Sequence, residues 1–189
     1  MIRIADLSAL DLDRAYAAGE LSPVEATENA LARIERFEPA INAFVHRDAD
    51  ETLRQARAAE ARRRWSRLDG APGTVKDNIA VAGWPNRRGS AVSSAAPATQ
   101  DAPVVARLRA AGAVLLGKTA MPEYGWKGTG DSPLSGMTRN PWDTATSPGG
   151  SSSGAAACAA LNLGCIHLGT DGAGSIRIPA AFTGIFGIK

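Results

Sequence analysis

The sequence predicts an α/β protein whose mixed, mostly parallel sheet is flanked by helices. Three observations support this class. Helix-like segments fill most of residues 8–67, and from residue 74 onward short apolar strand-like segments alternate with further helix-like ones. Glycine-rich loops separate the last of these segments. Alternating strands and helices are typical of parallel strands covered by their crossover helices.

The region from residue 1 to about 67 is expected to be helical. Ser8 and Asp11 have the spacing of a capping-box variant, which would start the first helix. The string Ser22-Pro23-Val24-Glu25 is a stronger helix start, with a hydroxyl cap and proline at the first helical position. The second helix should end before Pro39. A third helix, rich in Ala and Arg, is expected over residues 48 to about 67.

The remainder, about residues 68–189, is expected to form an α/β core. Turn residues at 68–73 precede a short strand. Strands are expected at 74–79, 113–117 and 165–169, helices at 104–111, 154–163 and 176–182, and an ordered loop at 128–150. The apolar run at 184–189 resembles the start of another strand, so we expect the chain to be the first part of a larger, truncated domain.

Bulk composition argues against several classes of function. The 189 residues are 44% hydrophobic and 21% charged, as in a soluble globular domain. The net charge of +2 gives no argument for nucleic acid or an anionic membrane, and the arginine run at 61–65 is expected to be a solvated helix face. We expect no signal peptide or membrane span. Cys158 and Cys165 fit buried thiols in a reducing, cytoplasmic setting.

Two glycine-rich loops that contain serine indicate acyl-transfer chemistry. They are GGSSSG at 149–154 and GTDGAGS at 169–175. Glycines let backbone N–H groups approach a ligand closely. A glycine-rich turn that contains a serine would therefore hold a nucleophile and an oxyanion site together. The serine also needs a base. His46 and His167 are the only histidines and lie in neither loop, so a lysine would have to serve.

Four strings resemble the amidase signature family, serine hydrolases that cleave amide bonds with a Ser–Ser–Lys triad. The resemblance begins near residue 10 and implies the amidase signature fold, of which residues 1–189 would be the N-terminal part of a single domain. It implies no cofactor and no metal. The strings are LDGAPGTVKDNIAVAGWPNRRGS at 68–90, GKTAMPEYGWKG at 117–128, SPGGSSSG at 147–154 and GTDGAGSIRIPA at 169–180.

The resemblance also implies a role for each matching residue. It makes Ser175 the nucleophile, Lys76 the base and Ser151 the bridging serine, which in the family follows a cis peptide bond. A lysine acts as a base only when neutral, which requires its pKa to fall from about 10.4 to about 7–8, and burial can lower it that far. The backbone amides of Gly172, Ala173, Gly174 and Ser175 would form the oxyanion hole, and Asp171 and Arg177 an ion pair that fixes the loop.

The chain departs from the family pattern at a few places. Ala173 stands where glycine is more frequent, Ser153 replaces a glycine, and Asn86 stands where threonine is common. The first two changes lie in the serine loops, and the third lies in a loop near the predicted site. Because Ala173 belongs to the predicted oxyanion turn, that turn must accommodate a Cβ.

Several functions remain open. A stand-alone amidase would release ammonia or an amine from a small amide, with no nucleic acid or membrane partner and a possible homodimer. A glutamine-hydrolysing subunit of a tRNA-dependent amidotransferase would need partner subunits, and its usual Asn-Met-Asp-Glu-Phe string is replaced here by residues 120–124. An inactive fragment is a third possibility. A nucleotide-binding module is disfavoured, because neither loop has P-loop or Gly-x-Gly-x-x-Gly spacing.

Overall fold

The computed structural model describes residues 3–189, so the first two residues of the predicted helical region lie outside the described part. The α/β class is confirmed. The helices are α1 (Ala9–Ala18), α2 (Pro23–Ile41), α3 (Ala49–Glu60), α4 (Pro103–Ala110), α5 (Ser153–Ala160) and α6 (Arg177–Thr183), with 3-10 turns η1 (Ile4–Asp6) and η2 (Glu123–Gly125). The strands are β1 (Phe44–His46), β2 (Pro72–Lys76), β3 (Val114–Thr119), β4 (Asp131–Ser132), β5 (Gly136–Met137) and β6 (Ile166–Leu168).

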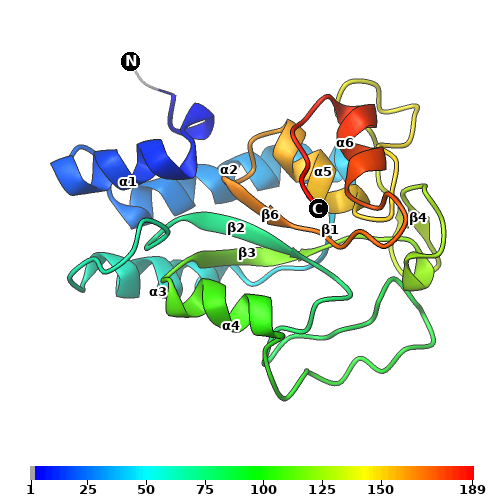
Figure 1. The fold of residues 1–189 in the computed structure, drawn as a ribbon, viewed down its shortest axis with the longest axis horizontal. Helices are drawn as coiled ribbons and strands as arrows, with labels where there is room; N and C mark the ends of the chain where they lie inside the picture. The colour runs from blue at the N-terminus through cyan, green and yellow to red at the C-terminus, as the bar shows by residue number, and fades with distance from the viewer. Residues whose placement is uncertain (1–2) are drawn as a thin grey trace.

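The main sheet has the strand order β1-β3-β2-β6. Strand β2 runs parallel to both β3 and β6, whereas β1 pairs antiparallel with β3 at one edge. The sheet is therefore mixed and mostly parallel, as the sequence predicts. Figure 1 shows α1, α2, α5 and α6 on one side of the sheet, with α3 and α4 on the other.

An apolar cluster lies on each face of the sheet. Leu116 belongs to the cluster that includes Ile34 of α2, and Val75 belongs to the cluster that includes Val105 of α4. Successive residues of a strand point to opposite faces. Because Val75 points toward α4, the next residue, Lys76, points toward the face covered by α5.

The predicted starts of the first two helices are confirmed, but the predicted end of α2 is wrong. Capping boxes are present at Ser8 and at Ser22. Helix α2 continues through Pro39 to Ile41. A proline in the last turn removes only one backbone hydrogen bond, and its fixed φ suits a helix. The helix ends instead at Ile41, and the next residue, Asn42, caps it with a left-handed φ of 53°.

Helix α3 ends at Glu60, earlier than predicted, and the arginine run is not a solvated helix face. Arg62 pairs with Asp69, and Arg64 pairs with Asp13. The Asp69 side chain is only 1% exposed. A buried carboxylate needs a partner of opposite charge, so these ion pairs draw the arginines away from the helical path.

Short strands and the end of the chain are the other differences. Strand β1 and the β4–β5 hairpin, within the expected loop at 128–150, were not predicted, because segments of two or three residues show no clear alternation of apolar and polar residues. The expectation of a strand at 184–189 is wrong for the described structure, where Gly184 caps α6 and these residues pair with no strand. The other predicted elements are present, with boundaries shifted by a few residues. No helix within residues 3–189 is long and apolar enough to cross a membrane.

Candidate active site

Lys76 is the last residue of β2 and is wholly buried. Its Nζ lies 2.8 Å from Ser151 Oγ, 3.0 Å from Ser152 Oγ and 2.9 Å from Thr170 Oγ1. These three side-chain neighbours are hydroxyl groups, which can donate as well as accept a hydrogen bond, and the Thr170 carbonyl oxygen lies farther away, at 3.5 Å. This environment can therefore surround a neutral amine, which accepts one hydrogen bond, as well as an ammonium ion.

Burial lowers the pKa of Lys76 from 10.5 to about 7, and the negative charge of Asp171 opposes this shift. The side-chain atoms within hydrogen-bond distance of the amine are uncharged, so they do not compensate a positive charge as a carboxylate would. A lysine with a pKa near neutrality is able to accept a proton at ordinary pH.

Ser151 is held in a tightly packed loop before α5. The Gly150–Ser151 peptide bond is cis, as the family resemblance implies. A Cβ on Gly150 would overlap the carbonyl oxygen of Thr129, so only glycine fits there. On the other side, a Cβ placed on Gly125 would lie 3.1 Å from Ser151 Oγ, which shows how closely that backbone approaches the hydroxyl. Ser151 itself is 2% exposed.

The turn that contains Ser175 is organised around the carboxylate of Asp171. The backbone N–H groups of Gly174 and Ile176 donate to this carboxylate over 2.7 and 3.1 Å. Arg177 donates two further hydrogen bonds from its guanidinium, each 3.0 Å long, and so forms the expected ion pair. The Arg177 hydrogen bonds and then the backbone donors hold the pKa of Asp171 far below its usual range. The carboxylate thus remains charged and fixes the turn.

The predicted nucleophile approaches the lysine–serine pair through the backbone. The Ser152 N–H donates to the Ser175 carbonyl oxygen over 3.0 Å. Within residues 3–189, no hydrogen bond joins Ser175 Oγ to Ser151 Oγ. The Gly174 N–H already donates to Asp171. Of the four amides predicted to form the oxyanion hole, those of Gly172, Ala173 and Ser175 remain as candidates.

Sequence reasoning missed several residues of this site. Ser152 and Thr170 contact Lys76 directly, and Asn78 Nδ2 donates to Thr170 Oγ1 over 3.0 Å. These residues lie inside the strings that carry the family resemblance. Their place in those strings was the only feature of the sequence that could have indicated a role in the site. Lys118 of β3 is a second wholly buried lysine, whose signal was its place in the apolar segment VLLGKT.

The two histidines lie outside the lysine–serine cluster. His167 is on β6, and its ring nitrogens lie 2.9 Å from Thr74 Oγ1 and 3.3 Å from the Gly164 carbonyl oxygen. Burial lowers the pKa of His167 to about 4. The ring of His46 is 5.0 Å from that of Trp84. Neither histidine hydrogen-bonds to Lys76 or to the predicted catalytic serines.

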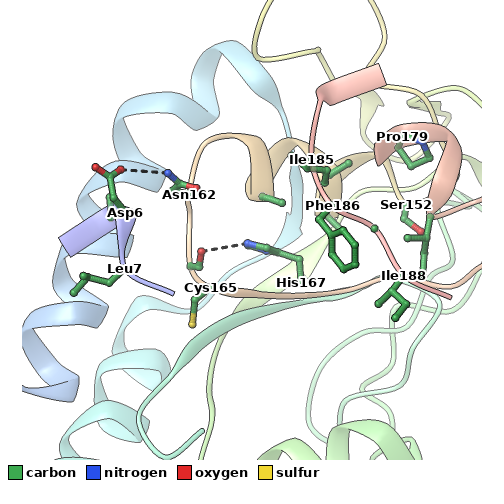
Figure 2. Close-up of a pocket in the computed structure, with 18 residues that line it drawn as sticks. Asp6, Leu7, Ser152, Asn162, Cys165, His167, Pro179, Ile185, Phe186 and Ile188 are labelled. Carbon is green, nitrogen blue, oxygen red and sulfur yellow. Dashed lines mark hydrogen bonds between the residues drawn. The ribbon is translucent and has the colours of Figure 1, made fainter. Parts of the chain in front are cut away.

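A cavity of about 380 Å³ lies beside the site, between β6, α6 and the last residues of the chain. Ser152, His167, Phe186 and Ile188 are among its lining residues, and Figure 2 shows Phe186 between His167 and Ser152 in this view, with Ile188 near Ser152. Ser152 links the cavity to Lys76, but Ser151 and Ser175 do not line it. The cavity is therefore adjacent to the predicted catalytic groups and does not contain them.

The chain resembles known proteins of one family along most of its length. The family model described as Amidase matches residues 25–189. The chain is 47% identical to a subunit of the glutamyl-tRNA(Gln) amidotransferase of Symbiobacterium thermophilum, over 97% of this chain and 38% of that protein. It is 43% identical to an acylamidase of Rhodococcus erythropolis, over 97% of this chain and 39% of that protein.

Solved structures give the same result. The native peptide amidase from Stenotrophomonas maltophilia matches with a TM-score of 0.88 and 36% identity, over 95% of this chain and 39% of that chain. A bacterial aryl acylamidase of the amidase signature family matches with a TM-score of 0.85 and 35% identity, over 93% of this chain and 37% of that chain. The present chain thus spans about two fifths of the length of these relatives.

Proposed function

Since this chain belongs to the amidase signature family, we propose that it contains the catalytic groups of an amide-bond hydrolase that works through an acyl-enzyme intermediate. The observation that supports this most directly is the 2.8 Å contact between Lys76 Nζ and Ser151 Oγ in a buried setting, where no carboxylate bonds to the amine. A lysine placed there to stabilise the fold would normally be paired with a carboxylate. An unpaired amine of lowered pKa beside a serine is the arrangement of a general base.

In the first step, Ser175 Oγ forms a bond with the amide carbonyl carbon. The π electrons of the C=O bond move to its oxygen, and the Ser175 proton passes to Ser151, whose own proton passes to the neutral amine of Lys76. The Ser175 side chain must turn toward Ser151 for this transfer. Catalytic hydrogen bonds are often long or poorly aligned before substrate binds and tighten in the complex.

The developing oxyanion would be stabilised by backbone N–H groups of the Ser175 turn. The amides of Gly172, Ala173 and Ser175 are the candidates, because the Gly174 amide is donated to Asp171. Each such donor contributes roughly 3–4 kcal/mol to transition-state stabilisation in known acyl-transfer enzymes. The Asp171–Arg177 pair positions these donors without touching the substrate.

In the second step, the tetrahedral intermediate collapses and the carbon–nitrogen bond breaks. Ser151 delivers a proton to the leaving nitrogen and regains one from Lys76, which becomes neutral again. Ammonia or an amine leaves, and the acyl group stays on Ser175. Water then attacks the ester by the same relay and releases the carboxylic acid.

The test is reaction of the chain with a fluorophosphonate, which forms an Oγ–P bond to an activated serine and releases fluoride. We expect one adduct by intact mass, located at Ser175 by peptide mapping. Ser175→Ala should abolish the adduct, and Lys76→Met should slow its formation at least about 100-fold, the usual range for a general base. Ser153→Ala is the matched control, because Ser153 donates only to the Ala120 carbonyl oxygen. An adduct retained in Ser175→Ala would overturn the assignment.

A second candidate is the glutamine-hydrolysing subunit of a tRNA-dependent amidotransferase. The 47% identity to a subunit of a glutamyl-tRNA(Gln) amidotransferase favours it. The segment from Ala120 to Tyr124 does not contain the Asn-Met-Asp-Glu-Phe string typical of that subclass, which favours the stand-alone amidase. Measuring ammonia released from glutamine, with and without the other amidotransferase subunits, separates the two. Release only in their presence would reverse the preference.

A further inference from the structure

The structure contains a second buried lysine next to the first. In the pairing of β2 with β3, Val75 lies opposite Lys118, one residue before Lys76. Lys118 is wholly buried. Its Nζ donates hydrogen bonds to the carbonyl oxygens of Ile79, at 2.9 Å, and Pro85, at 3.1 Å. The proposed reaction gives this lysine no role.

The groups around Lys118 differ chemically from those around Lys76. A third bond, 3.0 Å long, goes to Asn86 Oδ1, so Lys118 has three partners that can only accept. Three acceptors require three N–H groups, which only the ammonium form provides. The Asp77 carboxylate, 3.6 Å away, supplies the compensating charge. Burial lowers the pKa of Lys118 only to about 8, because Asp77 opposes the shift.

Both members of this ion pair hold the same loop, residues 79–90. Lys118 binds its start, at Ile79, and its middle, at residues 85–86. Asp77 Oδ2 accepts a 2.8 Å hydrogen bond from the N–H of Gly89, near its end. The loop is therefore attached at both ends to residues at or just beyond the carboxyl ends of β2 and β3.

The end of the loop in turn holds the segment at 121–125. The Arg88 carbonyl oxygen accepts the Tyr124 N–H over 2.8 Å, and Ser90 Oγ donates to Glu123 Oε1 over 2.7 Å. The two backbones are so close that a Cβ on Gly89 would overlap the Met121 carbonyl oxygen. The last residue of this segment is Gly125, where an added Cβ would lie only 3.1 Å from Ser151 Oγ.

We propose that Lys118 is a positioning residue: its three hydrogen bonds fix the loop at 79–90, which holds the segment at 121–125 against Ser151. The two buried lysines then have separate tasks that follow from their surroundings. Lys76, among hydroxyls, is free to take a proton, whereas Lys118, among carbonyl and amide oxygens, retains its protons and orders the wall of the site. The catalytic consequence rests on the proposed function, but the structural coupling does not.

Amide hydrogen exchange of the full chain tests the structural coupling without requiring activity. In Lys118→Met we expect peptides that contain Gly89 and Tyr124 to exchange at least about tenfold faster, with α2 unchanged, because the opening of this loop becomes more favourable. The control is Ile34→Val or Ile34→Ala, in the core on the opposite face, whichever matches the Tm of Lys118→Met. Faster exchange at 79–90 without any change at 121–125 would overturn the proposal.

A second variant covers the case in which Lys118→Met does not fold. Asn86→Ala removes one of the three acceptors from a half-buried position, so the fold should tolerate it. We expect the exchange of the same two segments, 79–90 and 121–125, to accelerate by a smaller factor. Unchanged exchange at 121–125 in this variant would also overturn the proposal.

Fluorophosphonate labelling of Ser175 supplies the catalytic readout. We expect the maximal labelling rate of Lys118→Met to fall by about 10–100-fold, with little change in the half-saturating concentration, since a misplaced catalytic group mainly reduces the rate of the bond-forming step. The Tm-matched Ile34 variant should label at the wild-type rate. If the wild-type chain is not labelled, the proposed function fails while hydrogen exchange still decides the coupling. Equal labelling of Lys118→Met and the control would refute the catalytic role.

Discussion

Replacement of Lys76 by methionine is expected to change how protein stability depends on pH. The pKa of this amine is about 7 in the folded protein and 10.5 in an exposed lysine. Between these values the unfolded chain binds a proton that the folded protein does not, so raising the pH favours folding. One pKa unit corresponds to about 1.4 kcal/mol, so burial of this amine costs roughly 5 kcal/mol at pH values below the folded pKa. From about pH 7 to about pH 9, roughly 2 kcal/mol of this cost disappears.

Urea unfolding of wild type and Lys76→Met across this pH range measures the effect. The free energy of unfolding of wild type, relative to the variant, should rise by roughly 2 kcal/mol between about pH 7 and about pH 9. Val105→Ala is the control, because the Val105 side chain is buried but has no titratable group. Its free energy of unfolding should differ from that of wild type by the same amount at every pH. A pH-independent difference for Lys76→Met would show that the lysine keeps an ordinary pKa, and the argument for a neutral base would be refuted.

Three further outcomes are expected. The second-order rate constant of fluorophosphonate labelling should rise with pH through about 7, because the neutral form of Lys76 is the reactive one; a rate that falls across this range would exclude lysine as the base. Gly150→Ala should abolish labelling, since its Cβ overlaps the Thr129 carbonyl oxygen, and circular dichroism will show whether the fold survives. Ser22→Ala should lower the free energy of unfolding by about 1 kcal/mol through loss of the helix cap, without changing the labelling rate. An unchanged urea midpoint would contradict the role of that cap.

Local features of the fold could be predicted because their causes lie within a few residues. The capping boxes at Ser8 and Ser22 act over three residues, and the structure contains both. The strand that ends at Lys76 follows a turn that is evident in the sequence. The end of α2 was harder to predict, because proline in a last turn is tolerated and the left-handed conformation of Asn42 decides where the helix stops.

The candidate site, too, could be predicted from the sequence only in part. Motif strings alone were enough to predict Lys76, Ser151 and Ser175 as the catalytic residues. The partners Ser152 and Thr170 could not be predicted in this way, because they reach the lysine amine across 76 and 94 residues of sequence. The occupation of the Gly174 amide by Asp171 also required the structure, since it depends on how one turn is folded.

Short-range patterning and motif strings were enough to specify the α/β class, the helix starts, the family and the residues of the predicted triad. They could not specify that a second lysine, Lys118, is buried as completely as Lys76, nor which groups surround each amine. Lys76 and Lys118 both lie on short strands and both lose their water. They differ in the groups that replace that water. Lys76 is surrounded by hydroxyls from two distant loops, with one carbonyl oxygen at 3.5 Å, whereas Lys118 is surrounded by carbonyl oxygens, an amide oxygen and a carboxylate. In the roles proposed for the two lysines, those neighbours decide which one exchanges its proton, and only the tertiary structure brings them together.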